Sequence, residues 1–198
     1  SDILDAAILA QLPCCGKITW MSPLASDDYA EYRDEGFLTL LNLQHLQPAL
    51  EQFWPKRGPQ WDALGFSDHG DVLLVEAKAH VAELHSPASQ AGAASLEKIK
   101  AALTEAAMRF GAPADASWHG KFYQLANRLA HLHWLRKHGV AAWLILINFI
   151  GDKEMRGPET SSEWEAAYHE AFAALAIAVD PPLLAHVLHI YLDVKNVR

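Results

Sequence analysis

The chain has 198 residues, of which 51% are hydrophobic and 20% are charged, a balance typical of a globular protein rather than a disordered one. This length fits a single domain with a substantial core. The formal net charge is −8, from 24 acidic and 16 basic side chains. That charge argues against a general nucleic-acid coating protein, which depends on basic charge, but it leaves a nuclease open.

No apolar run reaches the roughly 20 residues that a membrane helix needs. The longest, residues 140–147, has the length of a strand. Asp2 stands where a secretion signal would carry positive charge, so we expect a cytoplasmic protein with no membrane partner. The two cysteines, Cys14 and Cys15, are adjacent, which suits neither a zinc site nor a redox pair and predicts reduced thiols.

The first part of the chain is predicted to be mainly helical, and residues 1–53 are treated as an N-terminal helical extension. Its expected elements are a helix at 3–12 ended by Pro13, an extended piece at 17–20, a helix at 26–35 capped by Ser26, and a helix at 37–53 with Pro48 marking a kink. Pro and Gly in residues 54–59 predict a loop.

The rest of the chain alternates strands and helices. Two strands, at residues 60–66 and 71–80, are joined by turn-forming residues that suit a hairpin. The later expected elements are helices at 95–110 and 121–138, a continuously apolar central strand at 140–150, a helix from the Thr160–Glu163 capping box to 176, and a strand at 187–194. This order predicts an α/β fold, with helices on a mixed sheet, in one domain over residues 1–198.

Two carboxylates and a lysine gather on the expected hairpin. Asp62 lies on the first strand, and Glu76, Lys78 and His80 recur two apart on the second. Because side chains alternate along a strand, the three residues of the second strand should share one face. Acids and a lysine together on an apolar sheet suggest a divalent-metal site that cuts phosphodiesters.

An acid-x-Lys triplet alone is weak evidence, because a chain of this composition should contain about one by chance. Asp193-Val194-Lys195 also fits the pattern. It lies near the end of the chain with no helix after it, whereas Glu76-Ala77-Lys78 ends an apolar strand, has an acid fourteen residues upstream and is followed by a helix. Context therefore favours the earlier triplet.

Asp62 followed by Glu76-Ala77-Lys78, within alternating strands and helices, resembles the PD-(D/E)XK superfamily of restriction-endonuclease-like nucleases. The wider pattern, from Trp54-Pro55 to Phe122-Tyr123-Gln124, is similar to a bacterial subgroup of that superfamily without a known function. The resemblance spans roughly residues 45–195 and implies a restriction-endonuclease-like mixed sheet as the core. One departure is that Trp61, not proline, precedes Asp62.

The resemblance implies roles that chemistry supports independently. Asp62, Glu76 and the backbone carbonyl of Ala77 would hold Mg²⁺, with Mn²⁺ as a substitute, because hard cations prefer oxygen ligands. Lys78 would orient the attacking water or stabilise developing negative charge. Glu51 matches an acid that some members add from the preceding helix. Asp71 is a weaker substitute for Asp62.

The helix expected at 121–138 has a polar face formed by Gln124, Arg128 and His131. By resemblance, Gln124 and Arg128 are candidates for substrate binding, and Arg128 could meet a phosphate. The alternative is that this face is polar because it meets solvent. His80 is a further candidate for substrate contact, since it shares the expected face of Glu76 and Lys78.

The sequence therefore predicts metal-dependent hydrolysis of phosphodiesters in nucleic acid, with DNA favoured over RNA. Two alternatives stay open: a nuclease-like domain that only binds or scaffolds, and a hydrolase of a small phosphorylated molecule. The bland interpretation is that Asp62, Glu76 and Lys78 form a salt-bridged structural cluster. Phosphate-binding glycine motifs are missing, so no nucleotide cofactor is expected, and a homodimer is left open.

Overall fold

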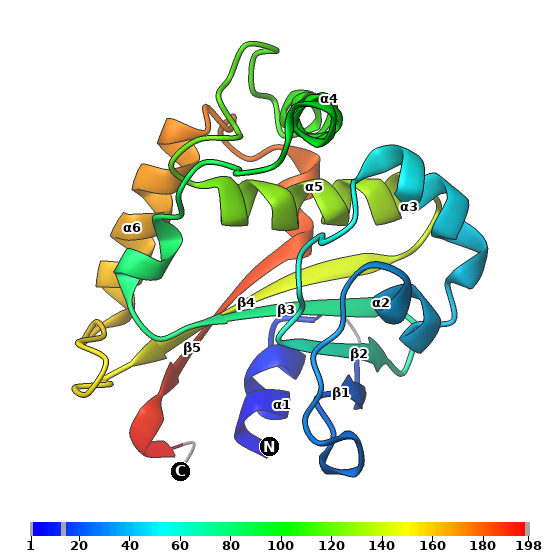
Figure 1. Ribbon diagram of the computed structural model, residues 1–198. Helices are drawn as coiled ribbons and strands as arrows, with labels where there is room; N and C mark the ends of the chain where they lie inside the picture. The colour runs from blue at the N-terminus through cyan, green and yellow to red at the C-terminus, as the bar shows by residue number, and fades with distance from the viewer. Residues whose placement is uncertain (1, 13–14, 197–198) are drawn as a thin grey trace.

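A five-stranded mixed sheet flanked by helices organises the protein in the computed structural model, which describes residues 2–12 and 15–196 (Figure 1). The strands lie in chain order across the sheet: β1 (Ile18–Ser22), β2 (Ala63–Ser67), β3 (Val72–Lys78), β4 (Ala142–Ile150) and β5 (Val187–Asp193). β1, β2 and β3 pair antiparallel, and β3, β4 and β5 pair parallel. The general α/β class is therefore confirmed.

Helices cover both faces of the sheet (Figure 1). They are α1 (Asp2–Leu9), α2 (Asp34–Leu40), α3 (Gln47–Phe53), α4 (Ala93–Arg109), α5 (Tyr123–Lys137) and α6 (Ser161–Ala174). α5 lies across one face with α4 beyond it, and α1 lies on the opposite face. None of the helices in the described part of the chain is both long and apolar enough to cross a membrane.

The alternation of β3 separates two cores. Val72 and Leu74 pack into the larger core, which includes residues of α4 and α5. Leu73 and Val75 pack into the smaller core, which includes residues of α1 and β5. Glu76 continues the series of Val72 and Leu74, so strand geometry directs its side chain to the face that α5 covers.

α5 is buried almost all round, since every residue from 125 to 135 is buried. One side of the helix meets the sheet and another meets α4, as the contacts of α5 with β4 and α4 indicate (Figure 1). The polar residues Arg128 and His131 retain only 8% and 1% exposure. The alternative of a solvent-exposed polar face is therefore wrong for these two side chains.

Several expected elements are confirmed. The hairpin of β2 and β3 and the interior position of β4, between β3 and β5, agree with the sequence. At the start of α6, the Glu163 carboxylate accepts hydrogen bonds from the Thr160 N–H at 3.2 Å and its hydroxyl at 3.1 Å, as the capping box predicts. Cys15 is a free thiol, whereas Cys14 and Pro13 lie outside the described residues.

The helix expected at 26–35 is wrong. A 3₁₀ turn at Ala25–Asp27 forms there and α2 begins only at Asp34, because Asp28 and Tyr29 adopt positive φ values of 49° and 56° that a helix does not allow. The helix expected at 37–53 is two helices, α2 and α3, separated where Asn42 has a φ of 58°. The N-terminal segment is thus not purely helical, and it also supplies β1 to the sheet.

The close approach of β1 to β2 at Gly65 generates a stability prediction. A Cβ at Gly65 would lie 3.0 Å from both the Thr19 carbonyl oxygen and the Trp20 ring. Gly65→Ala should therefore lower the free energy of unfolding by about 1–3 kcal/mol, although Gly→Ala in open structure is usually stabilising. Urea denaturation measures the change. Gly120→Ala, which meets only an ordinary 3.4 Å contact, is the control and should not destabilise.

Candidate active site

The end of β3 brings three of the expected side chains together. Asp62 directly precedes β2, and the register Ala63↔Val75 sets it beside the Glu76 end of β3. Asp62 Oδ2 accepts a hydrogen bond from the Ala77 N–H at 2.6 Å. Glu76 and Lys78 are each only 6% exposed, and they share one face because they are two apart on the strand.

Glu76 is held between two cations. Its Oε1 lies 2.8 Å from Lys78 Nζ, and its Oε2 lies 2.7 Å from Arg128 Nε. Arg128 reaches the site from α5, which explains why a charged residue is tolerated inside a buried helix. A buried charge without a partner is costly, so this double pairing is what allows Glu76 to stay ionised.

The Arg128 guanidinium is itself fixed on several sides. It donates to Asn127 Oδ1 at 2.8 Å and to the Gln60 carbonyl at 2.9 Å. It also lies over the ring of Trp61, 5.0 Å from the centroid, and Trp61 is fully buried. These contacts hold Arg128 as a rigid bridge from α5 to the start of β2.

The two carboxylates differ in their electrostatic surroundings. Burial raises the pKa of Asp62 to about 6, the negative charge of Glu76 adds to this, and the Ala77 N–H and Arg128 offset only part of it. Burial also pushes the pKa of Glu76 upward, but the charges of Arg128 and Lys78 outweigh that effect and hold it below its usual range. In the described part of the chain no cation pairs with Asp62, so its charge is poorly compensated.

The groups beside Asp62 are oxygen donors of the kind that a divalent cation prefers. Each residue of a strand directs its N–H and C=O toward the same neighbouring strand, so the Ala77 carbonyl lies on the side of Asp62. Within residues 2–12 and 15–196 no group of three or more His, Cys, Asp or Glu side chains could hold a metal. The expected ligand set needs only two carboxylates and a carbonyl, and Mg²⁺ usually keeps several waters.

A polar cavity of about 380 Å³ lies beside this cluster. Arg128 lines it, so the same guanidinium that pairs with Glu76 also meets the cavity. The other lining side chains include Gln60, Gln124 and Asn127, and the loop of residues 86–90 forms one wall. The Ser86 hydroxyl accepts the Gln124 N–H at 2.9 Å and so fixes this loop to the start of α5.

Three other candidates contact residues outside the cluster of Asp62, Glu76 and Lys78. Glu51 is exposed on α3, receives a hydrogen bond from Gln47 at 3.3 Å and lines a different cavity. Asp71 accepts the Ser67 hydroxyl at 3.0 Å within the hairpin turn. His80 follows the end of β3, and its Nε2 lies 3.5 Å from Glu83. Their roles in a site stay predictions.

Sequence reasoning missed two parts of this region. Glu31 accepts a hydrogen bond from the Gln60 side chain at 3.0 Å, and its charge contributes to the raised pKa of Asp62. Asn148 pairs in register with Lys78 and accepts the Tyr168 hydroxyl at 2.9 Å. A lone asparagine in an apolar strand was a usable signal for Asn148, whereas nothing local marks Glu31.

Comparison with known proteins assigns no family. No protein-family model, no curated protein and no solved structure matches this chain significantly. The functional conclusion therefore depends on the chemistry and geometry of the residues described above.

The raised pKa of Asp62 predicts a pH-dependent effect of Asp62→Asn. The folded state holds its proton more tightly than the unfolded state, so the unchanged protein loses stability as the pH rises from about 4 to about 6. Asp62→Asn removes this loss. Above pH 6 its free energy of unfolding should exceed that of the unchanged protein by about 1 kcal/mol, a value reduced because Asp62 is partly exposed. Urea denaturation from pH 4 to 8 measures it. A variant that is less stable at pH 8 would contradict the assignment.

The bridge formed by Arg128 predicts a large loss of stability in Arg128→Gln. The substitution leaves Glu76 Oε2 buried without its cation, and breaking a buried pair from one side costs about 3 kcal/mol or more. Arg128 is therefore expected to contribute to folding as well as to the candidate site. Arg33→Gln, which removes an exposed arginine, is the matched control and should change the free energy of unfolding by less than about 0.5 kcal/mol.

Proposed function

We propose that this protein is a metal-dependent phosphodiesterase acting on nucleic acid, with a restriction-endonuclease-like core and with DNA favoured over RNA. The observation that carries the proposal is the pair of carboxylates at the end of β3. Glu76 is neutralised by Lys78 and Arg128, while Asp62 is left with a poorly compensated charge beside the Ala77 backbone. A cation is the simplest partner for that charge.

Asp62, Glu76 and the Ala77 carbonyl are the residues that would hold Mg²⁺ or Mn²⁺, and all three supply oxygen. The bound cation would acidify a water and offset charge on the scissile phosphate. Lys78 is fixed within 2.8 Å of Glu76, so its ammonium is held where it can orient a water or stabilise an oxyanion. Glu76 and Lys78 are buried, which strengthens their interactions.

The polar cavity beside Arg128 is the proposed entry for the substrate. A guanidinium that lines a cavity can donate two parallel hydrogen bonds to a phosphate. Gln60 and Gln124 add uncharged donors and acceptors to the same lining. A local polar cavity also suits a protein with a net charge of −8, because binding then needs no broad basic surface.

The second candidate is a nuclease-like domain that binds without cutting. It is favoured by one observation: both carboxylate oxygens of Glu76 already have cation partners, Lys78 and Arg128. A buried, fully paired network is also what a purely structural cluster would contain. Under this alternative the charge of Asp62 has no catalytic use.

A cleavage assay tests the proposal with a variant that keeps the fold. Labelled single- and double-stranded DNA and RNA are incubated with the unchanged protein and with Asp62→Asn, each with Mn²⁺ or Mg²⁺ and with a chelator. We expect metal-dependent cleavage, strongest on DNA, that falls by about 100-fold or more in Asp62→Asn, since loss of one charged group at a reacting centre commonly costs this much.

Asp193→Asn is the matched control, because Asp193 belongs to the other acid-x-Lys triplet and accepts the Lys195 N–H at 2.9 Å near the end of the chain. It should cleave at the rate of the unchanged protein. Binding of DNA without cleavage would support the second candidate. Equal cleavage by Asp62→Asn and the unchanged protein would contradict the proposed site.

A further inference from the structure

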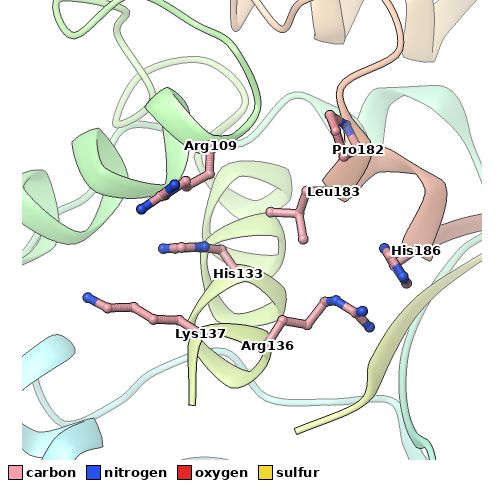
Figure 2. A pocket seen from close by; sticks show the side chains of 7 residues that line it. All are labelled: Arg109, His133, Arg136, Lys137, Pro182, Leu183 and His186. Atoms are coloured by element: carbon pink, nitrogen blue, oxygen red, sulfur yellow. The ribbon is translucent and has the colours of Figure 1, made fainter. Parts of the chain in front are cut away.

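A second cavity, of about 440 Å³, lies at the ends of α4 and α5 and is strongly basic. Five basic side chains line it: Arg109, His133, Arg136, Lys137 and His186 (Figure 2). Pro182 and Leu183 complete the lining. Its volume falls in the range of small-molecule sites. The protein as a whole is acidic, so this local gathering of basic groups needs a reason.

This cavity is separate from the carboxylate site. Arg136 donates to the carbonyl of Ala142, the first residue of β4, at 2.9 Å. Glu76 and Lys78 instead pair in register with Leu146 and Asn148, farther along β4. The two sites therefore lie toward opposite ends of the same strand, and no residue lines both.

The positive charge in the cavity exceeds the negative charge that faces it. Lys137 Nζ and His133 Nε2 share one carboxylate oxygen, Glu105 Oε1, each at 2.8 Å. Arg109 has no ion pair within the part of the chain that the structure describes, and Arg136 pairs with a neutral carbonyl. Asp71 acts electrostatically on Arg136 but does not line the cavity. The three permanent cations are thus only partly compensated.

The cationic groups form two sets with an apolar residue between them. Figure 2 shows Arg109, His133 and Lys137 extending to one side, while Arg136 extends toward His186 on the other and Leu183 lies between. Burial lowers the pKa of His186, and the positive charge of Arg136 lowers it further, which is the effect of like charges held close together. A ligand with negative charge at two points would offset the positive charge of both sets.

Helix dipoles alone do not explain this arrangement. The C-terminus of a helix carries about half a negative charge, which favours basic residues in the last turn. That accounts for Arg109 at the end of α4 and for Arg136 and Lys137 at the end of α5. It does not account for the 3₁₀ turn Pro182–His186, which adds Leu183 and His186 to the same cavity.

We infer that this basic cavity binds a ligand with two linked phosphate groups. Arg109 and Lys137 would donate charge-assisted hydrogen bonds to one phosphate, and Arg136 would donate to the other. The apolar side chain of Leu183 lies between the two sets in Figure 2. Pyrophosphate is the smallest probe of this chemistry, and two neighbouring phosphates of a nucleic-acid strand are its other source.

Isothermal titration calorimetry with pyrophosphate at low salt, without divalent metal, tests the inference on the full chain. Arg109→Gln and Lys137→Gln alter exposed side chains, so both variants should fold. Each should weaken binding about tenfold, because each removes a hydrogen bond to a charged group. Lys100→Gln is the matched control: it removes the same charge from α4, where Lys100 pairs with Glu97 outside the cavity, and should bind like the unchanged protein.

Inorganic phosphate should bind more weakly than pyrophosphate, because it can reach only one set of cations. A short oligonucleotide without terminal phosphates identifies the source: competition with pyrophosphate assigns the ligand to a nucleic-acid strand, and lack of competition assigns it to a small diphosphate. No pyrophosphate binding at millimolar concentration, or equal weakening in Lys100→Gln, would overturn the inference. Asp62→Asn should bind pyrophosphate normally, so failure of the nuclease proposal would not affect this result.

Discussion

The burial of the Glu76 charge is the constraint on which the candidate site depends. A carboxylate that is 6% exposed must be paired, and its partners come from two elements: Lys78 on the same strand and Arg128 on α5. Because Arg128 also contacts Trp61 and the Gln60 carbonyl, this pairing fixes α5, β3 and the segment before β2 relative to one another. The position of Asp62 follows from that arrangement.

The two carboxylates of this cluster are compensated unevenly. Glu76 is neutralised by Lys78 and Arg128. Within the described residues, the Asp62 carboxylate instead accepts one hydrogen bond, from the Ala77 N–H, and its pKa is raised to about 6, with Glu76 and Glu31 adding negative charge around it. At the ends of α4 and α5 the imbalance has the opposite sign: the cationic side chains of the cavity outnumber the carboxylates that pair with them.

The sequence alone predicted the features that depend on the local periodicity of a strand or helix. The shared face of Glu76 and Lys78 follows from strand alternation, and their 2.8 Å ion pair confirms it. The pairing of Arg128 with Glu76 joins residues 52 positions apart, and no local pattern reveals such a contact or the complete burial of α5. The prediction of a helix at 26–35 was wrong because Asp28 and Tyr29 adopt positive φ, and a tyrosine gives no sign of that conformation.

Calorimetric titration of the protein with Mn²⁺ is the most direct test of the central claim. If Asp62 is a ligand of a divalent cation, the unchanged protein should bind Mn²⁺ at millimolar or lower concentration. Asp62→Asn should lose that binding while keeping its fold. Absence of binding in the unchanged protein, or equal binding in both, would contradict the account and would leave Glu76, Lys78 and Arg128 as a structural ion cluster.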